Sequence, residues 1–127
     1  MHEIEDIPNE DRLYYRVHQS YFSRGELKPG VFREIGDGMS TDWAKYSTPL
    51  ESRNRAKKPE KNGIVSFIVG DLRKLNLTVV HAPSKENRAH TNVKLVNDVE
   101  IRLKLLDQLL DPNNETVKWE IPIKTIT

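Results

Sequence analysis

The segment HAPSKENRAHTN, residues 81 to 92, places two histidines, an asparagine and an arginine directly after the apolar run LTVV. Histidine titrates near neutral pH and suits general acid–base catalysis, and arginine binds phosphate through a planar fork of donors. We therefore take His81 and His90 as candidate catalytic residues, and Asn87 and Arg88 as candidate ligand-binding residues. The alternative is a solvated loop, because asparagine is a natural turn former and histidines at strand ends are often surface residues.

A second group of candidates lies in LYYRVH, residues 13 to 18, whose aromatic and β-branched residues are typical of a half-buried strand. The period of two places Arg16 and His18 on one face of this strand, and both are candidate ligand-binding residues. A buried arginine in an aromatic strand must find a partner. We predict that Arg16 borders a single polar cleft with His81, Asn87, Arg88 and His90.

The third candidate group is the hydroxyl pair Ser40 and Thr41, which precedes Asp42 and Trp43. Two hydroxyls beside an aromatic ring could bind a ribose or a base, so Ser40 and Thr41 are candidate ligand-binding residues. The alternative is a helix cap next to a core tryptophan, because serine and threonine are favoured N-caps. We expect one helical turn in MSTDWAKY.

Length and composition limit the class of protein. The chain has 127 residues, which suits one domain, with 36% hydrophobic and 31% charged residues and a net charge of +1. This charge gives no overall attraction to nucleic acid or to an anionic membrane. Cysteine is absent, which excludes disulfides and thiolate chemistry. The N-terminus lacks an apolar core and no run is long enough to span a bilayer, so we expect a cytoplasmic protein that does not enter the membrane.

The periodicity predicts an α+β fold, a single mostly antiparallel sheet of about five strands with one long helix packed on one face. A polar arm over residues 1–12 is expected to precede a single domain over 13–127. Thr48, Pro49 and Glu51 predict a helix start with a capping box. The predicted strands are 13–18, 63–69, 77–82, 90–96 and 116–124. The long helix is 98–110, capped by Asn97, and its inward stripe consists of Val99, Leu103, Leu106 and Leu110, widened by Leu105 and Leu109.

Known catalytic and nucleotide motifs are absent from the sequence. There is no GxxxxGK[ST], GxGxxG, GxSxG or HExxH, so the sequence calls for no cofactor. A zinc site from His18, His81 and His90 is conceivable, but the spacing does not require one, and we expect no metal. The basic run 53–61 is interrupted by Glu60 and has no interleaved aromatic residue, which favours a solvated face over a nucleic-acid patch.

The order of LYYRVH, Phe32, MSTDW, a strand pair and NRAH resembles an uncharacterised group of small prokaryotic proteins, over most of the chain. The chain also resembles ADP-ribosyltransferase-like domains. That resemblance implies a role in NAD binding for Arg16 or His18, a mid-chain hydroxyl at Ser40 or Thr41, and a late glutamate at Glu120.

Three function classes remain open. The first is a metal-independent enzyme acting on a nucleotide or RNA, with His81 or His90 as the acid–base group and Arg16 or Arg88 holding phosphate. The second is an NAD-binding transferase of the kind just described. The third is a non-catalytic binding or regulatory module that takes a protein partner through its cleft or through edge strand 116–124.

Overall fold

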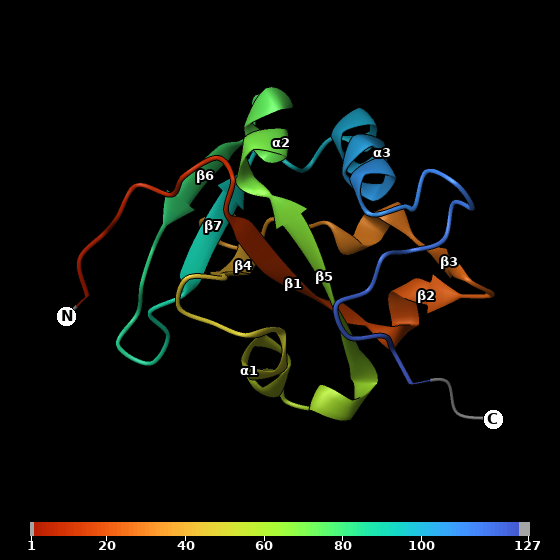
Figure 1. Ribbon diagram of the computed structural model, residues 1–127, viewed down its shortest axis with the longest axis horizontal. Coiled ribbons are helices and arrows are strands. Elements are labelled where there is room, and N and C mark those ends of the chain that lie inside the picture. The colour runs from red at the N-terminus through yellow and green to blue at the C-terminus, as the bar shows by residue number, and fades with distance from the viewer. Residues whose placement is uncertain (1, 125–127) are drawn as a thin grey trace.

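The computed structural model describes residues 2–124, and its centre is one five-stranded sheet (Figure 1). Every neighbouring pair of strands in this sheet is antiparallel. The predicted α+β class and mostly antiparallel sheet are therefore confirmed. In spatial order the strands are β5 (Asn62–Ile68), β1 (Arg12–His18), β4 (Met39–Trp43), β7 (His90–Lys94) and β6 (Thr78–His81).

Helices cover both faces of the sheet. Helix α1 (Pro49–Asn54) contacts β1 and β5 on one face, and α2 (Val69–Lys74) and α3 (Val99–Gln108) lie on the other (Figure 1). Among the described residues, no helix is long and apolar enough to cross a membrane. The remaining elements are short: η1 (Gln19–Tyr21), β2 (Phe22–Ser23), β3 (Glu26–Leu27), η2 (Pro29–Val31) and η3 (Pro59–Lys61).

The two faces of the sheet differ in chemistry because side chains alternate along each strand. On one face, Leu13, Val17, Phe67, Met39 and Val93 are buried in the core. The strand registers pair Tyr14 with Asp42 and Asp42 with His90, which places their side chains together on the opposite face. We call this opposite face, which carries Arg16, Ser40, Asp42, His90 and Asn92, the polar face.

Two of the predicted elements are wrong. Residues 39–43 form the central strand β4 rather than a helical turn, because Met39, Thr41 and Trp43 alternate into the core and both edges of the strand are paired. Residues 116–124 do not form a regular strand and make only isolated bridges, from Val117 to Leu110 and from Ile121 to Ile64. Pro122 has no amide to donate, so pairing cannot continue along this segment.

The helix starts were predicted with mixed success. The capping box of α1 is confirmed, since Thr48 accepts from the Glu51 amide and Glu51 accepts from the Thr48 amide. Helix α3 is capped by Asp98 and not by Asn97. The Oδ1 atom of Asn97 instead accepts hydrogen bonds from Arg102 and from the Glu34 amide.

The predicted inward stripe of α3 is wrong at Val99 and Leu103, whereas Leu106 packs against the core as predicted. Leu105 and Leu109 are buried, whereas Val99 and Leu103 are 71% and 52% exposed. Arg102 Nε donates to the carbonyl of Phe32 at 2.8 Å, which turns the face of residues 102, 105 and 109 toward the core.

The N-terminal arm contacts the domain through Glu5, Ile7 and Asn9. Ile7 is 4% exposed and belongs to the core, and Arg73 Nη1 donates to its carbonyl at 2.7 Å. The Gly70 amide donates to the carbonyl of Asn9 at 2.8 Å. The boundary that we place at residue 12 stays a prediction, but the arm contributes an apolar side chain to the core.

The corrected stripe of α3 can be tested by comparing two leucines. Replacing fully buried Leu105 with alanine should lower the free energy of unfolding by about 2–5 kcal/mol, because it removes packed methyl groups and leaves a cavity. Leu103→Ala, on the exposed side of the same helix, should change it by less than about 0.5 kcal/mol. Chemical denaturation measures both, and equal losses would show that α3 is not packed as described.

Candidate functional site

The polar face is organised around the buried carboxylate of Asp42, whose side chain is 4% exposed. Its Oδ2 accepts from Ser52 Oγ at 2.5 Å and pairs with Arg55 Nη1 at 3.1 Å and Arg16 Nη1 at 3.3 Å. Its Oδ1 accepts from Asn87 Nδ2 at 2.8 Å. A buried charge is tolerated only when it is paired and hydrogen-bonded, and Asp42 meets both conditions.

Three separate elements bring partners to Asp42. Strand β1 supplies Arg16. Helix α1 supplies Ser52 and its C-cap residue, Arg55. The turn before β7 supplies Asn87, whose amide donates to Ser84 Oγ and whose Oδ1 accepts from the Ala89 amide. Asn87 therefore acts as a turn former and as a partner of the carboxylate at once.

A pocket of about 290 Å³ opens where β1 and β4 part, next to this cluster. The paired register of the two strands ends at Tyr14–Asp42, although β1 continues to His18 and β4 begins at Met39. Continuing the register would place Arg16 opposite Ser40. The residues lining the pocket are Tyr15, Arg16, Arg33, Ile35, Gly38 and Ser40.

Arg33 is a residue that the sequence analysis missed. It lies in the loop between η2 and β4, is exposed, and its Nη1 donates to Tyr21 Oη at 2.9 Å. Gly38 holds this loop against β7: its φ is +151°, and an added Cβ would lie 3.0 Å from Asn92 Cβ and 3.1 Å from the Val93 carbonyl. Any side chain at this position would push the loop away from the sheet.

Ser40 and His90 form a hydrogen-bonded pair at the pocket. Ser40 Oγ lies 2.8 Å from His90 Nε2, and His90 Nδ1 lies 2.9 Å from the carbonyl of Ala82. A carbonyl can only accept, so Nδ1 carries a proton. In the neutral ring, Nε2 is then the acceptor and Ser40 is the donor, which is the arrangement of a general base beside a hydroxyl.

The charges at this site are unequal. Arg16 and Arg55 share the single carboxylate of Asp42, and Arg33 adds a third guanidinium at the pocket. The Arg16 and Arg55 side chains are 31% and 28% exposed, so part of each guanidinium faces solvent. The charged residues that line the pocket, Arg16 and Arg33, are both basic, and this favours an anionic ligand over a cationic one.

His81 lies on the opposite face of the sheet and is 1% exposed, so the prediction that it borders the same cleft is wrong. Its Nδ1 accepts from the Glu5 amide at 3.0 Å, and its Nε2 donates to the Arg88 carbonyl at 2.7 Å. Its ring packs against Trp43 and Tyr46, with centroid distances of 5.1 and 6.1 Å. These contacts are those of a core residue that holds the N-terminal arm.

Arg88 also lies away from the Asp42 cluster, so its placement in that cleft is wrong as well. Its guanidinium sits 4.1 Å from the Tyr46 ring centroid, and its Nη2 is 3.9 Å from Glu5 Oε2. Hydrogen bonds from Lys45 and Tyr46 hold the pKa of Glu5 below its usual value. This group fixes the arm to the domain.

The remaining candidates divide between the two faces. Thr41 is 3% exposed on the core side, and its hydroxyl donates to the Thr91 carbonyl at 2.9 Å. His18 ends β1, where its Nδ1 accepts from the Ser20 amide at 3.1 Å. Of the predicted site residues, the structure therefore groups Arg16, Ser40, Asn87 and His90.

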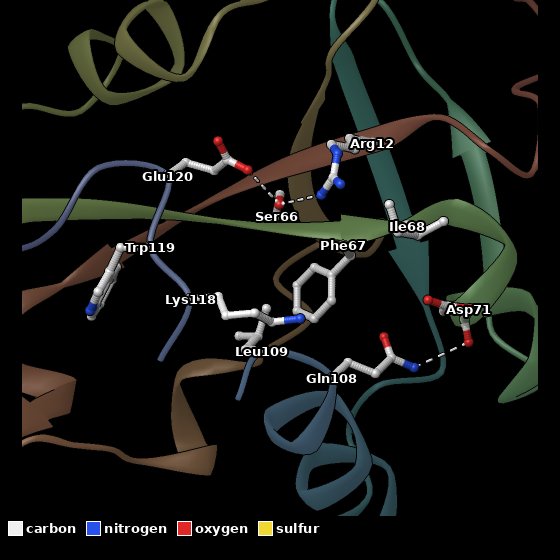
Figure 2. Close-up of a pocket in the computed structure, with 10 residues that line it drawn as sticks. All are labelled: Arg12, Ser66, Phe67, Ile68, Asp71, Gln108, Leu109, Lys118, Trp119 and Glu120. Carbon is white, nitrogen blue, oxygen red and sulfur yellow. Dashed lines mark hydrogen bonds between the residues drawn. The ribbon is translucent and has the colours of Figure 1, made fainter. Parts of the chain in front are cut away.

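Glu120 lies in a different pocket, of about 260 Å³, between the end of α3, β5 and the C-terminal segment (Figure 2). Figure 2 shows Ser66 between Arg12 and Glu120: Ser66 Oγ accepts from Arg12 Nη1 at 3.1 Å and donates to Glu120 Oε1 at 2.9 Å. Lys118 and Asp71 also line this pocket, so its charges are of both signs. The glutamate implied by the transferase resemblance is thus separated from the pocket that holds Arg16 and Ser40.

Within residues 2–124, no group of three or more histidine, aspartate or glutamate side chains is placed to hold a metal ion. The basic run 53–61 is partly engaged in the fold, since Arg53 Nε donates to the carbonyls of Pro59 and Asn62 at 2.8 and 3.1 Å.

Comparison with protein-family models, with curated proteins and with solved structures found no match for this chain. The two resemblances suggested by the sequence remain expectations.

The different surroundings of the two histidines predict different effects on stability. His81→Ala should lower the free energy of unfolding by about 2–4 kcal/mol, because it removes a buried ring and leaves the Glu5 amide and Arg88 carbonyl without their partner. His90→Ala should cost no more than about 1 kcal/mol, because His90 is half-buried on the polar face. Thermal or chemical unfolding of each variant checks this, and a larger loss for His90→Ala would contradict it.

Proposed function

We propose that the protein is a metal-independent enzyme whose polar face binds a phosphate-bearing ligand, a nucleotide or the end of an RNA strand. The observation that carries this proposal is the pocket where Arg16, Arg33 and Ser40 converge beside His90. Arginine is suited to phosphate because its planar fork can donate two parallel hydrogen bonds.

Arg16 is held in position before any ligand arrives. Its Nη1 is fixed by Asp42 Oδ2 and by the Ser52 carbonyl at 3.0 Å. A guanidinium that is already ordered loses less rotamer entropy when it binds an anion. Arg33 enters from an exposed loop, so it can approach the same anion from the other side of the pocket.

The pocket also offers apolar surface next to its charges. Ile35 is 73% exposed and Tyr15 forms another part of the wall. Burial raises the pKa of the Tyr15 hydroxyl to about 12, and this hydroxyl donates to the Val31 carbonyl, so it stays protonated at neutral pH. An apolar wall beside an anion site suits a ligand with both a phosphate and a base.

His90 supplies the acid–base chemistry in this proposal. Its ring nitrogens are both engaged with protein atoms, Nδ1 with a carbonyl and Nε2 with Ser40. That arrangement favours proton transfer over metal coordination, which requires a free ring nitrogen. Any turnover should therefore persist in the presence of a chelator.

Binding can be tested with inorganic phosphate and the adenosine monophosphates, measured by titration calorimetry. Arg16→Lys should weaken binding by about tenfold or more, because lysine keeps the charge but loses the bidentate fork. Arg12→Lys is the matched control, since Arg12 lies on the same face of β1 but in the other pocket. Equal effects of the two variants, or no binding by the wild type, would contradict the proposal, while binding without turnover of any nucleotide or RNA would favour a binding module.

A further inference from the structure

We propose that Ser40 is a nucleophile that accepts the phosphoryl group of a phosphate monoester, with His90 as its general base. This inference rests on the phosphate site proposed above and adds a covalent step to it. It starts from the 2.8 Å hydrogen bond between Ser40 Oγ and His90 Nε2 at the edge of the arginine-lined pocket.

The orientation of His90 is set by the backbone. The Nδ1 proton donates to the carbonyl of Ala82 at 2.9 Å, which keeps the Nε2 lone pair directed at Ser40. Ala82 is itself fixed, because its amide donates to the carbonyl of His90 at 2.9 Å. A nucleophile, a base and a group that orients the base are thus present together.

Ser40 differs from Thr41, Ser52 and Ser66, whose hydroxyls are held by other groups of the protein. Thr41 donates to a backbone carbonyl in the core, and Ser52 is buried and donates to Asp42. Ser66 is held between Arg12 and Glu120. Ser40 is exposed, and its hydroxyl faces a histidine at the mouth of a pocket.

Arg16 and Arg33 line the same pocket as Ser40, and in this proposal they hold the equatorial oxygens of the phosphoryl group. Phosphoryl transfer depends mainly on positioning and on stabilising the charge of these oxygens. Arginines therefore supply at this site what the transfer reaction requires.

The proposed step balances without a further reagent. As the Ser40 Oγ–phosphorus bond forms, the bond from phosphorus to the ester oxygen breaks, and the Ser40 proton passes to His90 Nε2. The departing alkoxide lies in line on the opposite side of phosphorus, where it takes a proton from a solvent water and leaves as an alcohol, while His90 keeps the proton from Ser40. In the second step the hydroxide left by that water attacks phosphorus from the side that the alcohol has vacated. His90 returns its proton to Ser40 Oγ as the Oγ–phosphorus bond breaks, so Ser40 is regenerated and inorganic phosphate is released.

The chain contains an internal control for this proposal. Ser20 Oγ lies 2.9 Å from His18 Nδ1, so it forms a second serine–histidine hydrogen bond. Neither residue is among those that line the arginine pocket, and His18 Nδ1 also accepts from the Ser20 amide. A serine that reacts merely because it touches a histidine would react at both positions.

The test is covalent labelling of the full chain with an alkyl fluorophosphonate, followed by peptide mass spectrometry. Attack by serine on this probe displaces fluoride and leaves a stable phosphonyl ester. We expect the label on Ser40 and not on Ser20, no label in Ser40→Ala, and labelling at least about 10²-fold slower in His90→Asn. Ser20→Ala should be labelled at the wild-type rate.

An unlabelled Ser40, equal labelling of Ser40 and Ser20, or an unchanged rate in His90→Asn would overturn the proposal. Calorimetry with inorganic phosphate on the wild type and on Ser40→Ala separates this failure from that of the proposed function. Phosphate binding without labelling would remove the nucleophile and leave the phosphate site intact. Absence of both would remove both, provided that the unfolding temperature of each variant shows an intact fold.

Discussion

The buried carboxylate of Asp42 is the constraint on which the polar face depends. It sits on the central strand β4 with 4% of its side chain exposed, where an unpaired charge would cost several kilocalories per mole. Its partners come from β1, from α1 and from the turn before β7. The same contacts that stabilise the charge fix Arg16 in position and attach α1 to the sheet. The contacts that satisfy the Asp42 charge are therefore the same contacts that would prepare Arg16 for the proposed anion.

Because side chains alternate along each strand, residues that are neighbours in the sequence lie on opposite faces of the sheet. Along β4, Met39, Thr41 and Trp43 enter the core, while Ser40 and Asp42 reach the polar face. The segment 81–92 divides in the same way, with His81 in the core and His90 on the polar face. One of the two histidines anchors the N-terminal arm and the other faces the pocket.

Local patterns in the sequence were sufficient for much of the fold. The apolar and β-branched runs predicted β1, β5, β6 and β7, and the capping box predicted the start of α1, because these signals lie within a few residues. Strand β4 could not be predicted, since its pairing on both sides depends on distant segments that override the local preference for a turn. The rotation of α3 is likewise set by a long-range contact, from Arg102 to the carbonyl of Phe32.

The site itself was only partly predictable, and for a similar reason. The alternation of side chains along each strand, combined with the strand registers, correctly places Arg16 and His90 on one face of the sheet. No local pattern in the sequence indicated that Arg33 lies in the same pocket.

The central claim is that this pocket receives phosphate, and a ¹H–¹⁵N correlation spectrum of the protein titrated with inorganic phosphate tests it most directly. The account predicts that the saturable shifts are largest at Arg16, Arg33, Ser40 and His90. Shifts centred on the basic run 53–61, or no saturable shifts, would contradict it.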